Sequence, residues 1–266
     1  MNKELNKPIY SDNIYGTIKP TSISETLITA VPVINPVSDV VLYEYSPELT
    51  KQIFISKVYT ILWFQIFFTS IFIGVAHQVP VIQQFLLSNV GSMISLINMF
   101  LLLISTCVFF SSENMIKNHS FKFLCFYTIL ITYIVGYVGI IYSPTTLLLS
   151  GVSTLTIFSG LTLYAFQTKY DYTQHTSILI SSLLGLLCFG FFMSFVHIPY
   201  LSIVYSSLGA ILFSFYIIYD TQLIVGGKHR TIKFRESDYN VAAISLYTDI
   251  LNLFLFILQI IGGSHQ

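Results

Sequence analysis

Seven long apolar runs after residue 50 constrain the fold of this chain more than any other feature. Each run comes close to the length of about 20 residues that an α-helix needs to cross a bilayer. The runs do not alternate apolar and polar residues, as the strands of a membrane barrel do. The sequence therefore predicts an all-α membrane protein, a bundle of seven transmembrane helices. The runs are Val58–Ala76, Met93–Phe110, Phe123–Tyr142, Leu147–Phe166, Ile178–Val196, Leu201–Tyr219 and Val241–Ile261.

The composition favours a membrane environment over a soluble one. Charged residues make up 9% of the chain, against about 25% in an ordinary soluble domain. The formal net charge is zero, so no overall basic field indicates a nucleic-acid partner. The three cysteines, Cys107, Cys125 and Cys188, lie far apart in apolar runs, and we expect them to be buried, inert thiols.

The first fifty residues differ in character from the rest of the chain. They are polar, they contain several prolines, and they lack the apolar core of a signal peptide. We interpret residues 1–50 as a flexible cytosolic tail and residues 51–266 as the transmembrane domain.

The basic residues predict the orientation of the bundle. All twelve Lys and Arg residues either precede the first run or lie near the loops that follow the second, fourth and sixth runs. The positive-inside rule makes that side cytosolic, so the N-terminus is expected in the cytosol. Seven crossings then place the end of the last run on the opposite side. This orientation is the reverse of that of a G-protein-coupled receptor.

Two acidic residues, Asp220 and Asp249, stand in or at the end of the last two apolar runs. A charged Asp at the bilayer centre costs roughly 2.5–3.5 kcal/mol, so such a residue is expected to face the bundle interior and to serve a function. Asp249 lies ten residues after Tyr239, which is roughly 15 Å along a helix. Asp220 lies near the cytosolic end of the preceding run. Adjacent antiparallel helices would bring the two carboxyl groups within hydrogen-bonding reach.

Ser245, Thr248, Asp249 and Asn252 share one stripe of the last predicted helix, because they are spaced i, i+3, i+4 and i+7. Beyond Asn252 the run is apolar on all sides. We interpret the stripe as the polar lining of a pathway that enters from the cytosol and stops about halfway. The alternative is a buried polar cluster that holds helices together.

Two carboxyl groups in close contact cannot both ionise easily, so they can share a proton and titrate as a unit. Asp220 and Asp249 are thus predicted to form a pH-sensitive latch that opens when both ionise. Ca²⁺ prefers about six to eight oxygen ligands, so two Asp residues suit a weak, transient calcium site. We expect no cofactor.

Four stretches resemble the Bax inhibitor / Lifeguard family of multi-pass membrane proteins. FISKVYTILWFQIFFT (Phe54–Thr69) is similar to the family's first transmembrane segment, and LTLYAFQTKYDYT (Leu161–Thr173) is similar to its central loop motif. Leu208–Arg230 and Tyr239–Gly262 are similar to its C-terminal signature. The ordered combination spans most of the chain after the tail, and it is nearer to the Lifeguard branch.

The resemblance implies a bundle whose C-terminal helix is wrapped by the others. It also implies a Ca²⁺ leak across intracellular membranes and suppression of cell death. Asp220 and Asp249 match the family's paired aspartates, which form a pH-sensing latch in its bacterial members. The implied partners are the lipid bilayer, calcium ions and cell-death regulatory membrane proteins. The implied location is the membrane of the endoplasmic reticulum or Golgi. Lys117 stands alone where the family usually carries an Arg pair, which leaves a cationic partner for the latch open.

Two other functions stay open alongside a calcium leak. An intramembrane aspartyl protease also uses two aspartates on successive helices, one of them in a YD context like Tyr219–Asp220. Its second aspartate lies in GxGD, whereas Asp249 lies in LYTD, so we expect no enzymatic activity. A non-conducting interaction protein that restrains cell-death factors would keep the acidic pair only as a contact between helices.

Overall fold

The computed structural model describes residues 31–33, 42–44, 47–111, 113–195, 199–226 and 238–263. Contacts within the chain divide it into residues 1–50 and 51–266, which are described separately. In the first part, β1 (Val31–Val33) pairs antiparallel with β2 (Leu42–Glu44). The basic segment Lys228–Arg235 and most of the tail, on which the predicted orientation depends, lie outside the described residues.

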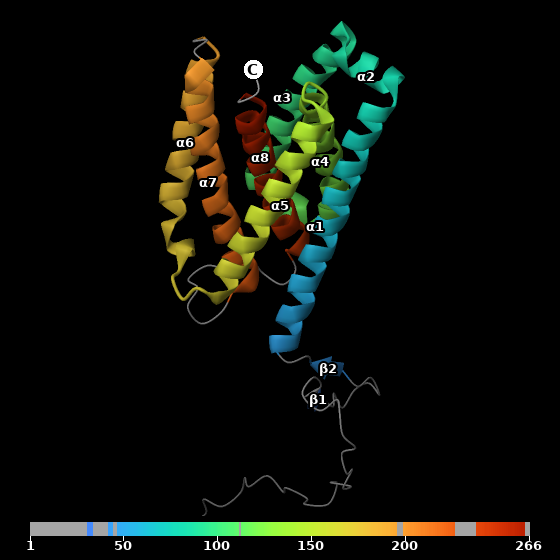
Figure 1. The fold of residues 1–266 in the computed structure, drawn as a ribbon. Helices are drawn as coiled ribbons and strands as arrows, with labels where there is room; N and C mark the ends of the chain where they lie inside the picture. The colour runs from blue at the N-terminus through green and yellow to red at the C-terminus, as the bar shows by residue number, and fades with distance from the viewer. Residues whose placement is uncertain are drawn as a thin grey trace, which may run out of the picture. The chain divides into compact units, whose positions relative to one another are not determined.

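Residues 51–266 form a bundle of long helices (Figure 1). Seven of the described helices are long and apolar enough to cross a membrane, which confirms the predicted fold class. Their bounds are α1 (Pro47–Gln78), α3 (Asn89–Ser111), α4 (Glu113–Gly139), α5 (Pro144–Gln167), α6 (Thr176–Met193), α7 (Pro199–Val225) and α8 (Tyr239–Gly263).

A short helix, α2 (Pro80–Leu87), joins α1 to α3 where the sequence predicts only a loop. Pro80 occupies its first turn. Proline is favoured there because a backbone N–H at this position would have no partner within the helix, and because its fixed φ is already helical. Leu86 is buried in a small apolar cluster with Ala76 and Ile140. At Gly91 a Cβ atom would collide with backbone carbonyl oxygens at the end of α2, so only glycine lets α3 begin so close to α2.

α8 is the most enclosed of the membrane helices. In its most apolar stretch 67% of the residues are buried, against 44% or less in the other six helices. It packs against α4, α5 and α7, and Figure 1 shows it inside the bundle. A helix that is apolar nearly all round is expected to be buried in this way.

The end of α7 is determined by Gly226, which has a φ of 57°. This left-handed conformation suits glycine, and the Gly226 N–H donates to the Gln222 carbonyl oxygen at 2.9 Å. Asp220 consequently lies in the last two turns of α7.

The prediction of buried thiols is wrong for all three cysteines. Cys107, Cys125 and Cys188 are exposed, on the outer faces of α3, α4 and α6. A membrane bundle places apolar residues outward as well as inward, because lipid tails are as apolar as leucine. An apolar sequence context therefore does not indicate burial in such a chain.

The small residues of α5 divide between two faces. Ser150 and Thr154 are buried, where small side chains let neighbouring helices approach closely. Thr156, Ser159 and Gly160 are exposed instead, so close helix packing does not explain them. A Cβ atom at Gly160 would meet nothing within 4 Å.

Candidate functional site

The structure brings Asp220 of α7 and Asp249 of α8 together inside the bundle. Their side chains are 3% and 6% exposed, respectively. The two carboxyl groups are in hydrogen-bonding contact with each other. The pair thus lies between two closely packed membrane-spanning helices, away from the outer surface.

Ser245 supplies the third polar group of this acidic site. It precedes Asp249 by one turn of α8, and its side chain hydrogen-bonds to Asp220. One oxygen of each carboxyl group, Oδ2, is buried and makes no hydrogen bond to the described residues. A buried carboxylate oxygen without a partner is costly, so the site requires neutralisation by a proton or a cation.

No basic side chain neutralises the acidic pair within the part of the chain that the structure describes. The side chains that hydrogen-bond to Asp220 and Asp249 there are each other and Ser245. The described residues also contain no group of three His, Cys, Asp or Glu side chains that could hold a metal ion. The site therefore offers few ligands to a cation, too few for tight binding.

The other two residues of the predicted polar stripe make hydrogen bonds to groups outside the acidic pair. The Thr248 hydroxyl donates to the Ile244 carbonyl oxygen at 2.7 Å and lies 3.3 Å from Tyr127 Oη on α4. Asn252 Nδ2 donates to the Thr248 carbonyl oxygen at 2.9 Å. The stripe thus spans two faces of α8, one toward α7 and one toward α4. A role of Thr248 and Asn252 in lining a pathway stays a prediction.

A second buried polar group, which the sequence analysis missed, joins α1, α4 and α8. Thr69, Thr132 and Tyr247 form this hydroxyl cluster, with oxygen separations of 2.6 to 3.2 Å. One turn away, Gln65 Nε2 donates to Thr128 Oγ1 at 2.8 Å. The sequence did contain a signal, because polar residues recur four positions apart in two apolar runs. Polar side chains in lipid seek partners across helices.

Gln222 is a further buried polar residue, two positions after Asp220. Its side-chain oxygen accepts from the Tyr172 N–H at 2.9 Å, and its Nε2 donates to the Tyr170 carbonyl oxygen at 2.9 Å. Gln222 is fully buried, whereas its two partners lie in a partly exposed loop. The two hydrogen bonds hold the loop between α5 and α6, which includes a 3₁₀ turn (Tyr172–His175), against the end of α7.

Comparisons with known proteins extend over the whole bundle. Residues 51–266 match the model of a family described as inhibitor of apoptosis-promoting Bax1. The chain is 28% identical to protein lifeguard 3 of Mus musculus over 224 residues, which are 83% of this chain and 72% of the relative. It is 26% identical to protein lifeguard 3 of Homo sapiens over 228 residues, 84% and 72% of the two chains. It is 38% identical to protein lifeguard 4 of Mus musculus over 115 residues, 43% and 46% of the two chains.

Proposed function

Since the chain belongs to the Bax inhibitor family, we propose that it suppresses apoptosis from within a membrane by controlling a leak of calcium ions. The observation that carries the proposal is the contact of Asp220 with Asp249. Two acidic side chains lie in membrane-spanning helices, and a charged Asp at the bilayer centre alone costs roughly 2.5–3.5 kcal/mol. A purely structural contact could be made by uncharged residues at lower cost. The presence of two acidic residues, where uncharged residues would cost less, therefore favours a functional role for the pair.

In the closed state the pair shares one proton. The proton removes one charge and lets one carboxyl group donate to the other, so α7 and α8 are held together. Ser245 completes the contact from α8. The leak is accordingly inhibited by acid.

In the open state both carboxyl groups are ionised. Like charges in contact inside a low-dielectric region repel each other strongly, and α7 separates from α8. The exposed oxygens then meet passing Ca²⁺ ions as a weak, transient site. Thr248 and Asn252 are proposed to line the pathway beyond the pair.

The proposed location is the membrane of the endoplasmic reticulum or Golgi, with the N-terminus in the cytosol. The distribution of Lys and Arg residues along the chain supports this orientation. The proposed partners are the bilayer, calcium ions and membrane proteins that regulate cell death.

Calcium efflux from liposomes that contain the purified chain tests the gate. We expect Asp249→Asn to lower the flux per molecule and to abolish its dependence on pH between about 6 and 8, because the pair can no longer hold two charges. Asp220→Ala should weaken the closed state, so that acid no longer inhibits the leak. Asp238→Asn removes an acidic residue just before α8 and serves as the control. Unchanged flux and an unchanged pH profile in both pair variants would show that the aspartates only join helices.

The same experiment separates the two alternative functions. A non-conducting interaction protein gives no flux above empty liposomes, yet still protects cells from death. An intramembrane aspartyl protease would cleave a membrane-embedded peptide and be blocked by transition-state inhibitors. Replacing either aspartate would inactivate such a protease, and Asp249→Asn would also weaken a leak. Loss of function alone therefore does not separate the two, whereas the calcium flux does.

A further inference from the structure

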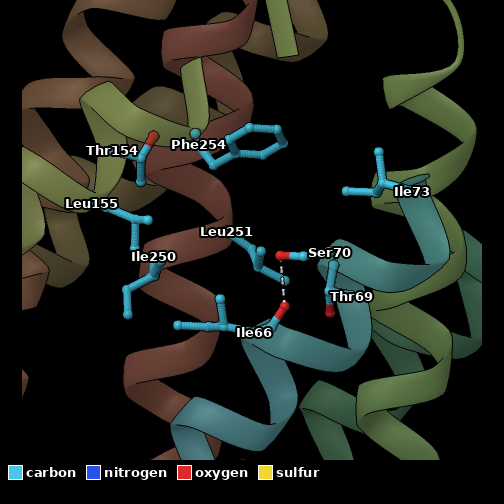
Figure 2. Close-up of a pocket in the computed structure, with 10 residues that line it drawn as sticks. Ile66, Thr69, Ser70, Ile73, Thr154, Leu155, Ile250, Leu251 and Phe254 are labelled. Carbon is cyan, nitrogen blue, oxygen red and sulfur yellow. Dashed lines mark hydrogen bonds between the residues drawn. The ribbon is translucent and has the colours of Figure 1, made fainter. Parts of the chain in front are cut away.

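A cavity of about 90 Å³ lies between α1, α5 and α8 (Figure 2). Its floor is formed by Ile250, Leu251 and Phe254 of α8, of which the first two are buried. Ser70 of α1 and Leu155 of α5 line it too, and both are exposed. The cavity is therefore an indentation in the outer wall of the bundle that reaches inward to α8.

The cavity lies at the middle of the membrane-spanning helices. Leu155 is the twelfth of 24 residues of α5, counted from Pro144. Ile250 is the twelfth of 25 residues of α8, counted from Tyr239. At that depth the medium outside the protein is the hydrocarbon core of the bilayer, which is about 30 Å thick. The cavity is thus continuous with the lipid-facing surface, and lipid tails are the molecules that reach it.

The lining suits hydrocarbon better than water. Most of its side chains are aliphatic or aromatic, and its hydroxyl groups already donate hydrogen bonds within the protein. Ser70 donates to the Ile66 carbonyl oxygen at 2.8 Å, and Thr154 donates to the Ser150 carbonyl oxygen at 2.7 Å. A buried water needs about two to four polar partners, and an apolar cavity without them stays dry.

The size of the cavity restricts the kind of hydrocarbon that fits. An apolar cavity of about 150 Å³ holds a benzene ring. At about 90 Å³ this cavity is smaller, so it fits a linear chain end and not a fused ring system. We propose that the cavity binds the terminal methylenes and methyl group of a lipid acyl chain.

The position of the cavity gives this binding a specific contact. Ile250 and Leu251 follow Asp249 directly in α8. A chain end in the cavity therefore packs against the turn of α8 that carries one member of the acidic pair. The binding itself does not depend on ion conduction, so it stands or falls separately from the proposed function.

Photocrosslinking tests the proposal with the full chain in phosphatidylcholine vesicles. One lipid probe carries a diazirine at the end of an acyl chain, and a second carries it next to the ester. We expect the chain-end probe to label Leu251–Phe254 and Leu155, because only this end reaches the middle of the bilayer. The ester-proximal probe should leave these residues unlabelled. Labelled residues are mapped by mass spectrometry.

Two glycine substitutions on the same helix supply the decisive comparison. Gly151 lines the cavity, and a Cβ atom there would meet nothing within 4 Å. Gly151→Leu should fill the cavity and reduce labelling of Leu251–Phe254 by about threefold or more. Gly160 has equal room but does not line the cavity, so Gly160→Leu should leave the labelling unchanged.

Equal labelling of Leu251–Phe254 in the wild-type chain and in Gly151→Leu would overturn the proposal, as would equal labelling by the two probes. Leucine is a better helix former than glycine, so Gly151→Leu should fold. Should its thermal unfolding differ from that of the wild-type chain, Leu155→Trp fills the same cavity from a residue that already occupies space there. Retained labelling in that variant would equally overturn the proposal.

Discussion

The hydroxyl groups of Thr69 and Tyr247 lie 2.6 Å apart, although 178 positions separate the two residues in the chain. This hydrogen bond joins α1 to α8, and Thr132 of α4 lies within reach of both hydroxyls. Tyr247 and Asp249 are two positions apart, which is about 200° around a helix, so they lie on opposite faces of α8. One face of α8 is thus held by neutral hydroxyls, whereas the other face carries the acidic pair.

Removing the Tyr247 hydroxyl should weaken the bundle only modestly. In Tyr247→Phe, Thr69 and Thr132 keep their own bond of 2.9 Å. Hydrogen bonds between membrane helices contribute about 0.6 kcal/mol on average and about 1.7 kcal/mol at most. We expect a loss of unfolding free energy within that range, measured by denaturation in mixed micelles. Tyr200→Phe is the control, because Tyr200 is 82% exposed. An equal loss in both variants would contradict a role of the hydroxyl cluster.

Replacing Gln222 should release the loop between α5 and α6. Gln222→Leu keeps a similar volume but removes the partners of the Tyr172 N–H and the Tyr170 carbonyl oxygen. A hydrogen bond typically contributes about 0.5–1.5 kcal/mol, so without these two the loop should detach more often. Lys169 is exposed in this loop, and trypsin cleavage after it should become faster.

Gln167→Leu is the matched control for this experiment, because Gln167 is exposed at the end of α5. Its trypsin cleavage should match that of the wild-type chain. If Gln222→Leu is cleaved no faster than Gln167→Leu, the two hydrogen bonds do not hold the loop in place.

The shared proton predicts how stability depends on pH. If the folded pair retains a proton that unfolded carboxyl groups have released near neutral pH, the folded state binds more protons, and its stability falls as pH rises. The slope is about 1.4 kcal/mol per pH unit at most for one proton. Denaturation of the wild-type chain between about pH 6 and 8 should show this fall, and Asp249→Asn should flatten it. A wild-type curve without slope would mean that no proton is shared.

The predicted orientation can be checked with epitope tags in sealed microsomes. A tag at Met1 should be digested by added protease, because the basic residues assign that side to the cytosol. A tag inserted between His77 and Val90, the segment that contains α2, should be protected until detergent is added. Protection of the Met1 tag in intact microsomes would reverse the orientation.

The helices and the acidic pair were predictable from the sequence because each follows from the cost of burying polar groups in lipid. A long apolar run without the alternation of a barrel strand is expected to form a helix, because a helix satisfies its own backbone hydrogen bonds in lipid. Asp220 and Asp249 were expected to face inward for the same reason, and both are buried. The depth estimate needed only the start of α8 at Tyr239 and the rise per residue.

Other features depend on contacts that no local pattern records. Gln222 binds backbone atoms of a distant loop, and backbone atoms leave no signature in the sequence. The hydroxyl cluster requires three helices to meet. Polar residues spaced four apart indicate that a helix has a polar partner, but they do not identify which helices it contacts. The cysteines were wrongly predicted to be buried, because an apolar context in a membrane chain does not indicate burial. The segment of α2 was wrongly predicted to be a loop, although it is apolar and forms a short helix.

The enclosed position of α8 has a consequence for how the protein is made. α8 follows the six other membrane helices in the chain, yet it is the most buried of the seven. Chains generally fold from the N-terminus during synthesis, so those six helices enter the bilayer before α8 has been made. They must either keep a gap open for α8 or close around it after it arrives. If synthesis stopped before Tyr239, the six inserted helices would lack α8 and the contacts that it makes with α4, α5 and α7.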